Sequence, residues 1–252
     1  MTRAYLFKLL RSPLTYIAII GTAALCFTNG IINRDFYIDT VAYHVDLFLH
    51  LDAYRKLLPV FGALPFTANF ADEWKSGVTI NCALRRGVKK YAAANVLFCA
   101  ATSLLTVVLG MLLYVLIYSF FIPLYAEYTN PFTFLLGRLL TGGLGWLYMI
   151  FQIFIFACSC SMWAVMGMLL SALMPNKYVA IASPFVASYI VERITIQFPP
   201  RFNLWLLSLA AMEWKSDLVG VLYTISVFAA ISAVCGILFY IVVRKRVRNE
   251  IT

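Results

Sequence analysis

The stretch YAAANVLFCAATSLLTVVLGMLLYVLIY, residues 91–118, contains no aspartate, glutamate, lysine or arginine. A helix needs about 20 consecutive apolar residues to cross the hydrocarbon core of a bilayer. The stretch is long enough for that, and it lacks the alternation of apolar and polar residues that is typical of membrane β-strands. It therefore predicts a transmembrane helix.

Five further apolar runs accompany it, at residues 14–29, 54–70, 139–174, 178–196 and 218–243. The 252 residues are 63% hydrophobic and 12% charged, whereas soluble domains are about 45–50% apolar and about 25% charged. We predict an all-α integral membrane protein with six spans and a single domain over residues 1–252. The run 139–174 is long enough for one projecting helix or two tight spans, and the charge distribution favours one.

Six spans place both termini on the same side of the membrane. Thirteen of the twenty lysines and arginines would lie on that side, and seven on the other. By the positive-inside rule, both termini and the segment 71–90 would be cytoplasmic. The net charge of +9 is then explained by topology and by attraction to anionic lipid, rather than by a nucleic-acid partner.

The N-terminal segment 1–12 interleaves apolar and basic residues and ends at Ser12-Pro13. This pattern favours an amphipathic helix at the cytoplasmic interface, the alternative being a frayed cationic tail. Basic residues followed by an apolar run are also typical of a signal peptide. The sequence Ala23-Ala24-Leu25-Cys26 is a poor lipoprotein cleavage site, so we expect an uncleaved first span.

Two outer segments are unusual. Residues 31–52 contain His44, Asp46, His50 and Asp52, which could ligate a metal, but the apolar residues between them favour an amphipathic surface helix, and we predict no metal. Residues 197–217 are half apolar and too short to cross and return, which favours short helices that dip into the outer leaflet.

The six cysteines have neither the spacing of a disulfide framework nor that of a zinc site, so we expect them to be small buried apolar residues. The chain also contains no phosphate-binding loop ending in Gly-Lys-Ser/Thr, no His-Glu-x-x-His and no Gly-x-Ser-x-Gly. We therefore predict no catalytic residue and no enzyme activity of its own. Energy for any uphill transport would come from a partner.

The segment 71–90 is a charged insert between the second and third apolar runs. With Phe70 before it, it contains the block Phe70-x-x-Glu73-x-x-x-Gly77, then Thr79, Leu84, Gly87-Val88 and Lys89-Lys90-Tyr91. This block and the layout of six spans with an amphipathic N-terminus resemble the permease subunits of type 2 exporters among the ATP-binding-cassette transporters. The layout covers nearly the whole chain, and the block covers about twenty residues.

The resemblance implies a partner and a mechanism. In that family two permease subunits pair, as a homodimer or heterodimer, and each docks a separate ATPase through a cytoplasmic coupling helix after the second span. The ATP and Mg²⁺ would be bound by that ATPase, and this chain would bind no cofactor. The implied coupling residues are Glu73, Trp74, Lys75, Gly77, Arg85 and Arg86.

The predicted function is thus the membrane subunit of an ATP-driven exporter in a bacterial plasma membrane. The cargo would be amphipathic: a peptide antibiotic, a lipid-linked glycan or a drug. Candidate residues for the translocation path are the polar side chains of the spans, Asn95, Gln152, Glu192 and Arg193, although Glu192 and Arg193 could instead neutralise each other. The alternatives are that the basic residues from Arg85 to Lys90 only enforce topology, and that the chain is a non-transport scaffold or sensor recruiting a partner through 71–90.

Overall fold

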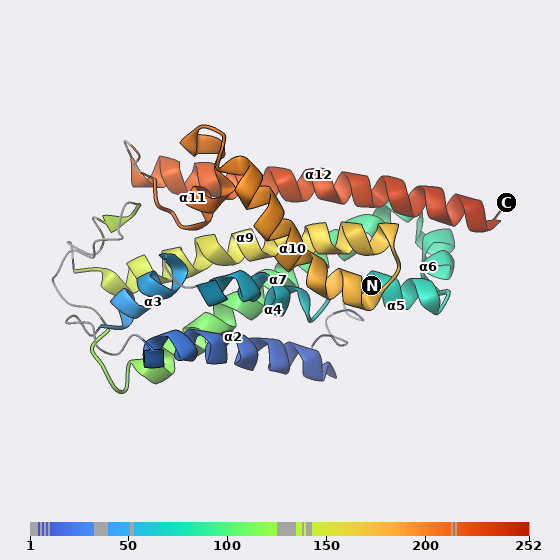
Figure 1. Ribbon diagram of the computed structural model, residues 1–252. Helices are drawn as coiled ribbons and strands as arrows, with labels where there is room; N and C mark the ends of the chain where they lie inside the picture. The colour runs from blue at the N-terminus through green and yellow to red at the C-terminus, as the bar shows by residue number, and fades with distance from the viewer. Residues whose placement is uncertain are drawn as a thin grey trace.

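A computed structural model of the chain describes residues 5, 7, 9, 11–32, 40–50, 53–124, 135–137, 139, 143–212, 214 and 216–251. It is 84% helical, and the described residues form no strand. Five helices make the body of the molecule: α2 (Pro13–Ile32), α7 (Val88–Tyr118), α9 (Gly145–Leu173), α10 (Lys177–Thr195) and α12 (Asp217–Ile251). Short helices complete each end of this bundle (Figure 1).

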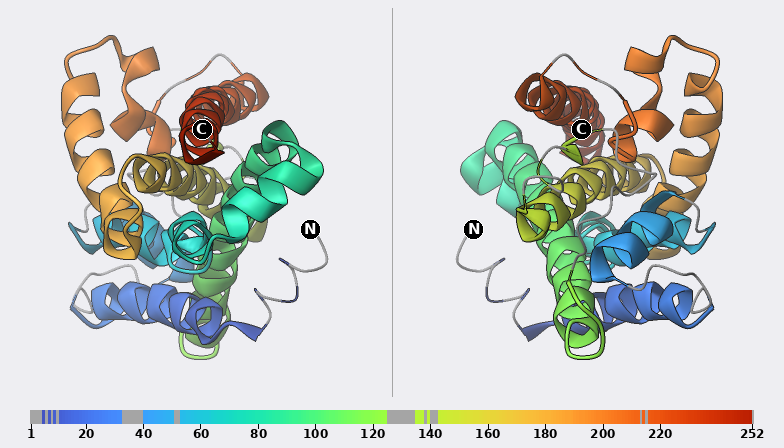
Figure 2. Two further views of the ribbon diagram at one scale, coloured as in Figure 1. Left: turned by 90° about the vertical axis from the view of Figure 1, so that its right-hand side faces the viewer. Right: turned by 90° about the vertical axis from the view of Figure 1, so that its left-hand side faces the viewer.

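Helix α9 lies at the centre. It packs against α7, α10, α12 and α4 (Leu58–Ala63), while α2 packs on the far side of α7 (Figure 2). Its largest buried side chain is Trp163, which is 1% exposed. The predicted run 139–174 therefore contains a single helix from Gly145 onward, not two spans.

Three described helices are long and apolar enough to cross a membrane: Val88–Tyr118, Gly145–Leu173 and Asp217–Glu250. Large apolar side chains are exposed along the outer helices, among them Ile20, Leu97, Ile190 and Leu222. A protein that stayed in water would bury such a surface. The chain is a multi-pass membrane protein, and six spans in total stay a prediction.

The second apolar run, 54–70, is not one continuous helix. It divides into the 3-10 helix η1 (Ala53–Leu57), α4, a series of turns at 64–68 and the start of α5 (Asn69–Lys75). Pro65 stands in the turns, where it has no N–H to donate and its ring crowds the carbonyl four residues earlier. The two prolines of this run, Pro59 and Pro65, were the signal in the sequence for this interruption.

Helix α3 (Val41–His50) differs from the expected surface helix. Eight of its ten residues are buried, because it packs on α2, α7, α9 and η1. Its first turn is fixed by hydrogen bonds from the Val41 and Ala42 amides to the Pro123 and Leu124 carbonyls, at 3.1 and 3.0 Å. The segment is part of the core rather than a covering layer.

The half-apolar segment 197–217 forms two short helices, η2 (Pro200–Phe202) and α11 (Leu204–Ser208). Leu204 and Leu207 are buried, and α11 packs on α9 and α10. Short helices were predicted here, and their depth in the membrane stays a prediction. Four of the six cysteines are buried, as expected, whereas Cys82 and Cys158 are half-buried.

The two ends of the bundle differ. We call the end with α5, α6 (Val78–Arg86) and the C-terminal turns of α12 the α6 end, and the end with α3 and α11 the α3 end (Figure 1). Of the predicted interfacial segment 1–12, Tyr5, Phe7, Leu9 and Arg11 are described and helical; residues 1–4, 6, 8 and 10 lie outside the described residues. Asp52 of the outer segment also lies outside them.

Candidate functional site

The predicted coupling segment 71–90 folds into α5, α6 and the first turn of α7. Gly77 joins α5 to α6 with φ of +70°, and Gly87 joins α6 to α7 with φ of +83°. A Cβ atom at either glycine would meet nothing within 4 Å, so the backbone conformation, not the space, requires glycine there. The segment is a hairpin of two short helices, with one glycine turn between α5 and α6 and a second between α6 and α7. We call it the α5–α6 hairpin.

Glu73 points into the protein from this hairpin. Its carboxylate accepts hydrogen bonds from the Tyr91 hydroxyl at 2.7 Å, the Tyr5 hydroxyl at 3.3 Å and the Asn69 amide at 2.8 Å. The side chain is 9% exposed, and within the described part of the chain no cation lies within ion-pair distance of it. Burying a carboxylate is costly unless hydrogen bonds replace water, and three donors do so here.

Asn95 extends these contacts into α7. Its amide nitrogen donates to the Tyr5 hydroxyl and to the Tyr91 carbonyl, at 3.3 and 3.2 Å, and its oxygen accepts from Asn69 at 3.3 Å. The Thr79 hydroxyl of α6 lies 3.2 Å from that of Tyr91. These six residues, which we call the Glu73 network, join the N-terminal segment, α5, α6 and α7.

The donors of the network stay protonated. Burial raises the pKa of the Tyr5 phenol above its ordinary value, and the negative charge of Glu73 raises it further. A phenol that does not ionise remains a hydrogen-bond donor to the carboxylate. The network is therefore a neutral set of donors arranged around one buried acceptor.

Trp74 is half-buried at the α6 end. Its ring stacks on Phe70 with centroids 5.9 Å apart, and the Arg246 guanidinium of α12 lies 5.5 Å from the ring centroid. Arg246 also donates to the Leu173 carbonyl at 2.6 Å. This contact links α5 to the last turns of α12 and to the end of α9.

The outward face of the α5–α6 hairpin is different in character. Leu84 is 64% exposed and Val78 is 42% exposed. Lys75, Arg85 and Arg86 are exposed beside them. Of the residues predicted to couple to a partner, Glu73, Trp74 and Gly77 thus serve the architecture of the hairpin, while Lys75, Arg85 and Arg86 are free to meet another molecule.

The four residues proposed for a translocation path lie in three separate places. Asn95 belongs to the Glu73 network. Gln152 donates to the Tyr148 hydroxyl at 3.1 Å, in the core beside α3. Glu192 and Arg193 lie on α10, where Glu192 pairs with Lys56 rather than with Arg193.

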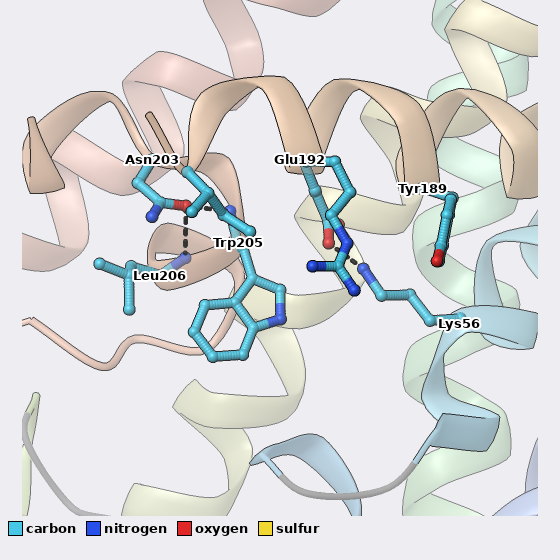
Figure 3. A pocket seen from close by; sticks show the side chains of 8 residues that line it. Lys56, Tyr189, Glu192, Asn203, Trp205 and Leu206 are labelled. Carbon is cyan, nitrogen blue, oxygen red and sulfur yellow. Dashed lines mark hydrogen bonds and ion pairs between the residues drawn. The ribbon is translucent and has the colours of Figure 1, made fainter. Parts of the chain in front are cut away.

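Glu192, Lys56 and Arg193 line a cleft of about 390 Å³ between η1, α10 and α11. Figure 3 shows the Lys56 ammonium meeting the Glu192 carboxylate, with the Trp205 indole below this pair. The other described residues that line it are Tyr189, Ile196, Asn203 and Leu206. We call this the α10 cleft.

Asp46, considered from the sequence only as a possible metal ligand, is a buried core residue. It is fully buried on α3, and the Tyr148 hydroxyl of α9 lies 3.0 Å from both of its oxygens. Burial raises the pKa of Asp46 to about 8, although the hydrogen bond from Tyr148 opposes this shift. Among the described residues no group of three or more His, Cys, Asp or Glu side chains could hold a metal ion.

Spacing in the sequence was a partial signal for these sites. Asn69 and Glu73 are four residues apart on α5, and Tyr91 and Asn95 are four apart on α7, which places each pair on one helix face. Nothing in the sequence pairs α5 with α7, or Asp46 with Tyr148, which is 102 positions away.

Comparison with known proteins gives no relative. No protein-family model, no curated protein and no solved structure matches the chain.

Proposed function

We propose that the chain is the membrane-spanning subunit of an ATP-driven exporter and that its α5–α6 hairpin docks a separate ATPase. What carries the proposal is the two-sided character of this hairpin. Its inner side is fixed to α7 through the buried Glu73 carboxylate, and its outer side exposes Leu84, at 64%, beside Arg85 and Arg86. Arginine is enriched in protein interfaces and among their hot spots, and an exposed apolar side chain beside it supplies area that a partner can bury.

The contacts of the hairpin give a route for mechanical coupling. A displacement of α6 acts on α7 through Gly87 and through the Thr79–Tyr91 contact of 3.2 Å. A displacement of α5 acts on α12 through Trp74 and Arg246. Since α5 also packs on α9, all three helices long enough to cross a membrane meet the docking element directly, and rigid packed elements are what transmit such movement.

The remaining parts of the proposal follow from it. ATP and Mg²⁺ would be bound by the ATPase, and a second permease subunit would complete the pathway. The α6 end would face the cytoplasm of a bacterial cell, because most of the cations lie on that side. The cargo would be amphipathic, as a peptide antibiotic, a lipid-linked glycan or a drug is.

The first test is capture of the partner by the tagged protein from its native membranes in mild detergent, followed by an assay of ATP hydrolysis. We expect a soluble ATPase to co-purify with the wild type and to be lost in Leu84→Asp, because the charge opposes burial of this position. Met174→Asp is the matched control: Met174 is 66% exposed in the link between α9 and α10, at the same end of the bundle. It should retain the ATPase.

Glu73 and Trp74 are poor choices for this test, because their buried contacts stabilise the hairpin itself. A protein obtained in good yield with no ATPase would contradict the exporter and would favour a scaffold or sensor. Equal loss in Leu84→Asp and Met174→Asp would contradict docking at α6.

A further inference from the structure

Among the described residues that line the α10 cleft, two are cations and one is a carboxylate. Lys56 and Glu192 neutralise each other, and Arg193 adds a second cation to the lining. The Arg193 guanidinium is exposed and lies 5.7 Å from the Tyr189 ring centroid, and it has no carboxylate partner among the described residues. An unmatched cation in a recess with low-dielectric walls attracts an anion.

A third cation, Arg55, is not among the lining residues but contacts one of them, Trp205. The Arg55 guanidinium is 5.6 Å from the Trp205 ring centroid, and it donates to the Leu49 carbonyl at 2.6 Å. Arg55 is 4% exposed, so water screens its charge weakly. Its field therefore adds to that of Lys56 and Arg193 around Trp205.

Neutral donors are present as well. The Asn203 oxygen accepts from the Trp205 and Leu206 amides at 3.0 and 3.3 Å. Its amide nitrogen and the Trp205 indole N–H make no hydrogen bond within the described part of the chain. In Figure 3 the indole nitrogen lies on the side of the ring nearer Lys56. The cleft can thus offer both charged and neutral donors to one anion.

Two of the described lining residues are aliphatic. Ile196 and Leu206 line the cleft, and Phe185 and Val186, three and four residues before Tyr189, continue the same face of α10 as exposed side chains, at 36% and 50%. An apolar chain attached to a bound anion would lie on this surface, which faces lipid in a membrane protein. The cleft therefore has the two kinds of surface that an anionic amphiphile requires.

We infer that the α10 cleft binds a phosphate group, with Arg193 and Lys56 as its cationic ligands, and that this phosphate is the headgroup of an amphiphile whose apolar chain lies along Ile196 and α10. An arginine matches phosphate geometry through its planar fork of donors, and a lysine adds a compact charge. The inference goes beyond the proposed function, because it involves neither the α5–α6 hairpin nor any ATPase.

Direct binding to the purified full chain in neutral detergent tests it. The probes are dioctanoylphosphatidylglycerol, dioctanoylglycerol, which has the same chains without phosphate, and inorganic phosphate, each titrated by calorimetry. We expect the phosphate-bearing lipid to bind at least about tenfold more tightly than dioctanoylglycerol, a difference that one charge-assisted contact supplies. Equal affinity for the two, or no binding of the phosphate-bearing lipid, would overturn the proposal.

Three variants locate the site. Arg193→Gln should weaken binding of the phosphate-bearing lipid about tenfold, whereas Arg201→Gln should leave it within about twofold, because Arg201 is exposed against Trp214 outside the cleft. Glu192→Gln should strengthen binding, because it removes the carboxylate that competes for Lys56. Damage to the fold would weaken lipid binding in both Arg193→Gln and Glu192→Gln. Weaker binding in the first and stronger binding in the second would therefore exclude such damage. Equal effects of Arg193→Gln and Arg201→Gln would place the phosphate elsewhere and overturn the proposal.

Inorganic phosphate separates the two sources of the anion. If inorganic phosphate displaces the lipid probe at concentrations close to that of the probe, the cationic phosphate site is supported. The lipid headgroup as its ligand is then overturned in favour of free phosphate. Absence of competition with tight lipid binding would make the ligand a lipid headgroup, as proposed.

Discussion

At the scale of single residues, Glu73 is the buried acceptor on which four segments converge. Replacing it by alanine removes the acceptor of Tyr5, Asn69 and Tyr91. Asn69 still donates to Asn95 and Tyr91 still contacts Thr79, so the Tyr5 hydroxyl loses most, and an unsatisfied buried group costs about 1–3 kcal/mol. Part of this cost is offset, because the variant no longer buries a charge. We expect Glu73→Ala to lower the free energy of unfolding by about 2 kcal/mol in detergent, and Glu73→Gln to lower it less.

Unfolding followed by tryptophan fluorescence measures this difference. Asp72→Ala is the matched control, since Asp72 is the preceding residue on α5 and is exposed. If Glu73→Ala and Asp72→Ala had the same free energy of unfolding, the network would not stabilise the α6 end.

Asp46 gives a second prediction at this scale, through pH. Because its pKa in the folded protein is about 8, folding favours the protonated form. The contribution of this group to the free energy of unfolding is fully present below its ordinary pKa near 4. It decreases by up to about 1.4 kcal/mol per pH unit as the pH rises, and it is lost once the pH has passed 8. We expect Asp46→Asn to flatten the decline in stability between pH 5 and pH 8.

The comparison requires thermal unfolding of wild type and Asp46→Asn across this pH range. His50 and Arg55, which lie close to Asp46, are common to both proteins, so the difference between the two curves isolates Asp46. Asp217→Asn, at the start of α12 near the same end, should keep the wild-type pH dependence. Parallel curves for wild type and Asp46→Asn would mean that Asp46 is ionised in the fold.

At the scale of elements, the α5–α6 hairpin depends on the left-handed turn at Gly77. An L residue at this backbone conformation costs about 1–2 kcal/mol, and asparagine tolerates it better than most. A side chain at this position meets no neighbour, so the cost is one of conformation alone. We expect stability to decrease in the order Gly77→Asn, Gly77→Ala, Gly77→Val, with about 1 kcal/mol lost in the alanine variant.

The same three proteins, tested for ATPase capture, separate hairpin geometry from stability. Capture should fall in the same order, while Leu84→Asp should lose capture without losing stability, because Leu84 is on the surface. Equal stability of all three Gly77 variants would show that the turn relaxes to another conformation.

At the scale of the whole molecule, α7 should separate two aqueous sides. Ser76 precedes α7 at the α6 end, and Phe120 follows it with 79% exposure. We expect a membrane-impermeant maleimide to label Phe120→Cys in intact cells and to label Ser76→Cys only after the cells are opened. The wild type, with its six free cysteines, gives the background. Labelling of both sites from the same side would contradict a membrane-crossing α7.

How much of this architecture the sequence could predict depends on the kind of contact. The helices α7, α9 and α12 were predictable, because each is a long apolar run, and the interruption of the second run follows from Pro59 and Pro65. The burial of α3 was not predictable, since its apolar face could rest on lipid or on protein equally well.

The roles of Glu73 and Trp74 were assigned to a partner, because a charged and an aromatic residue in a polar insert resemble a docking surface. Their inward contacts depend on Tyr91 and Arg246, which only the folded bundle brings to them.

The central place of α9 has a consequence for biosynthesis. The chain is made from its N-terminus, so α2, α4 and α7 leave the ribosome before the helix on which α4 and α7 pack. Helix α2 has α7 as an early partner, but α4 is only six residues long and obtains much of its packing from α9 and α10. We expect the first half of the protein to remain an open intermediate until α9 is inserted, and this order of events would make it dependent on insertion factors that hold it in the membrane.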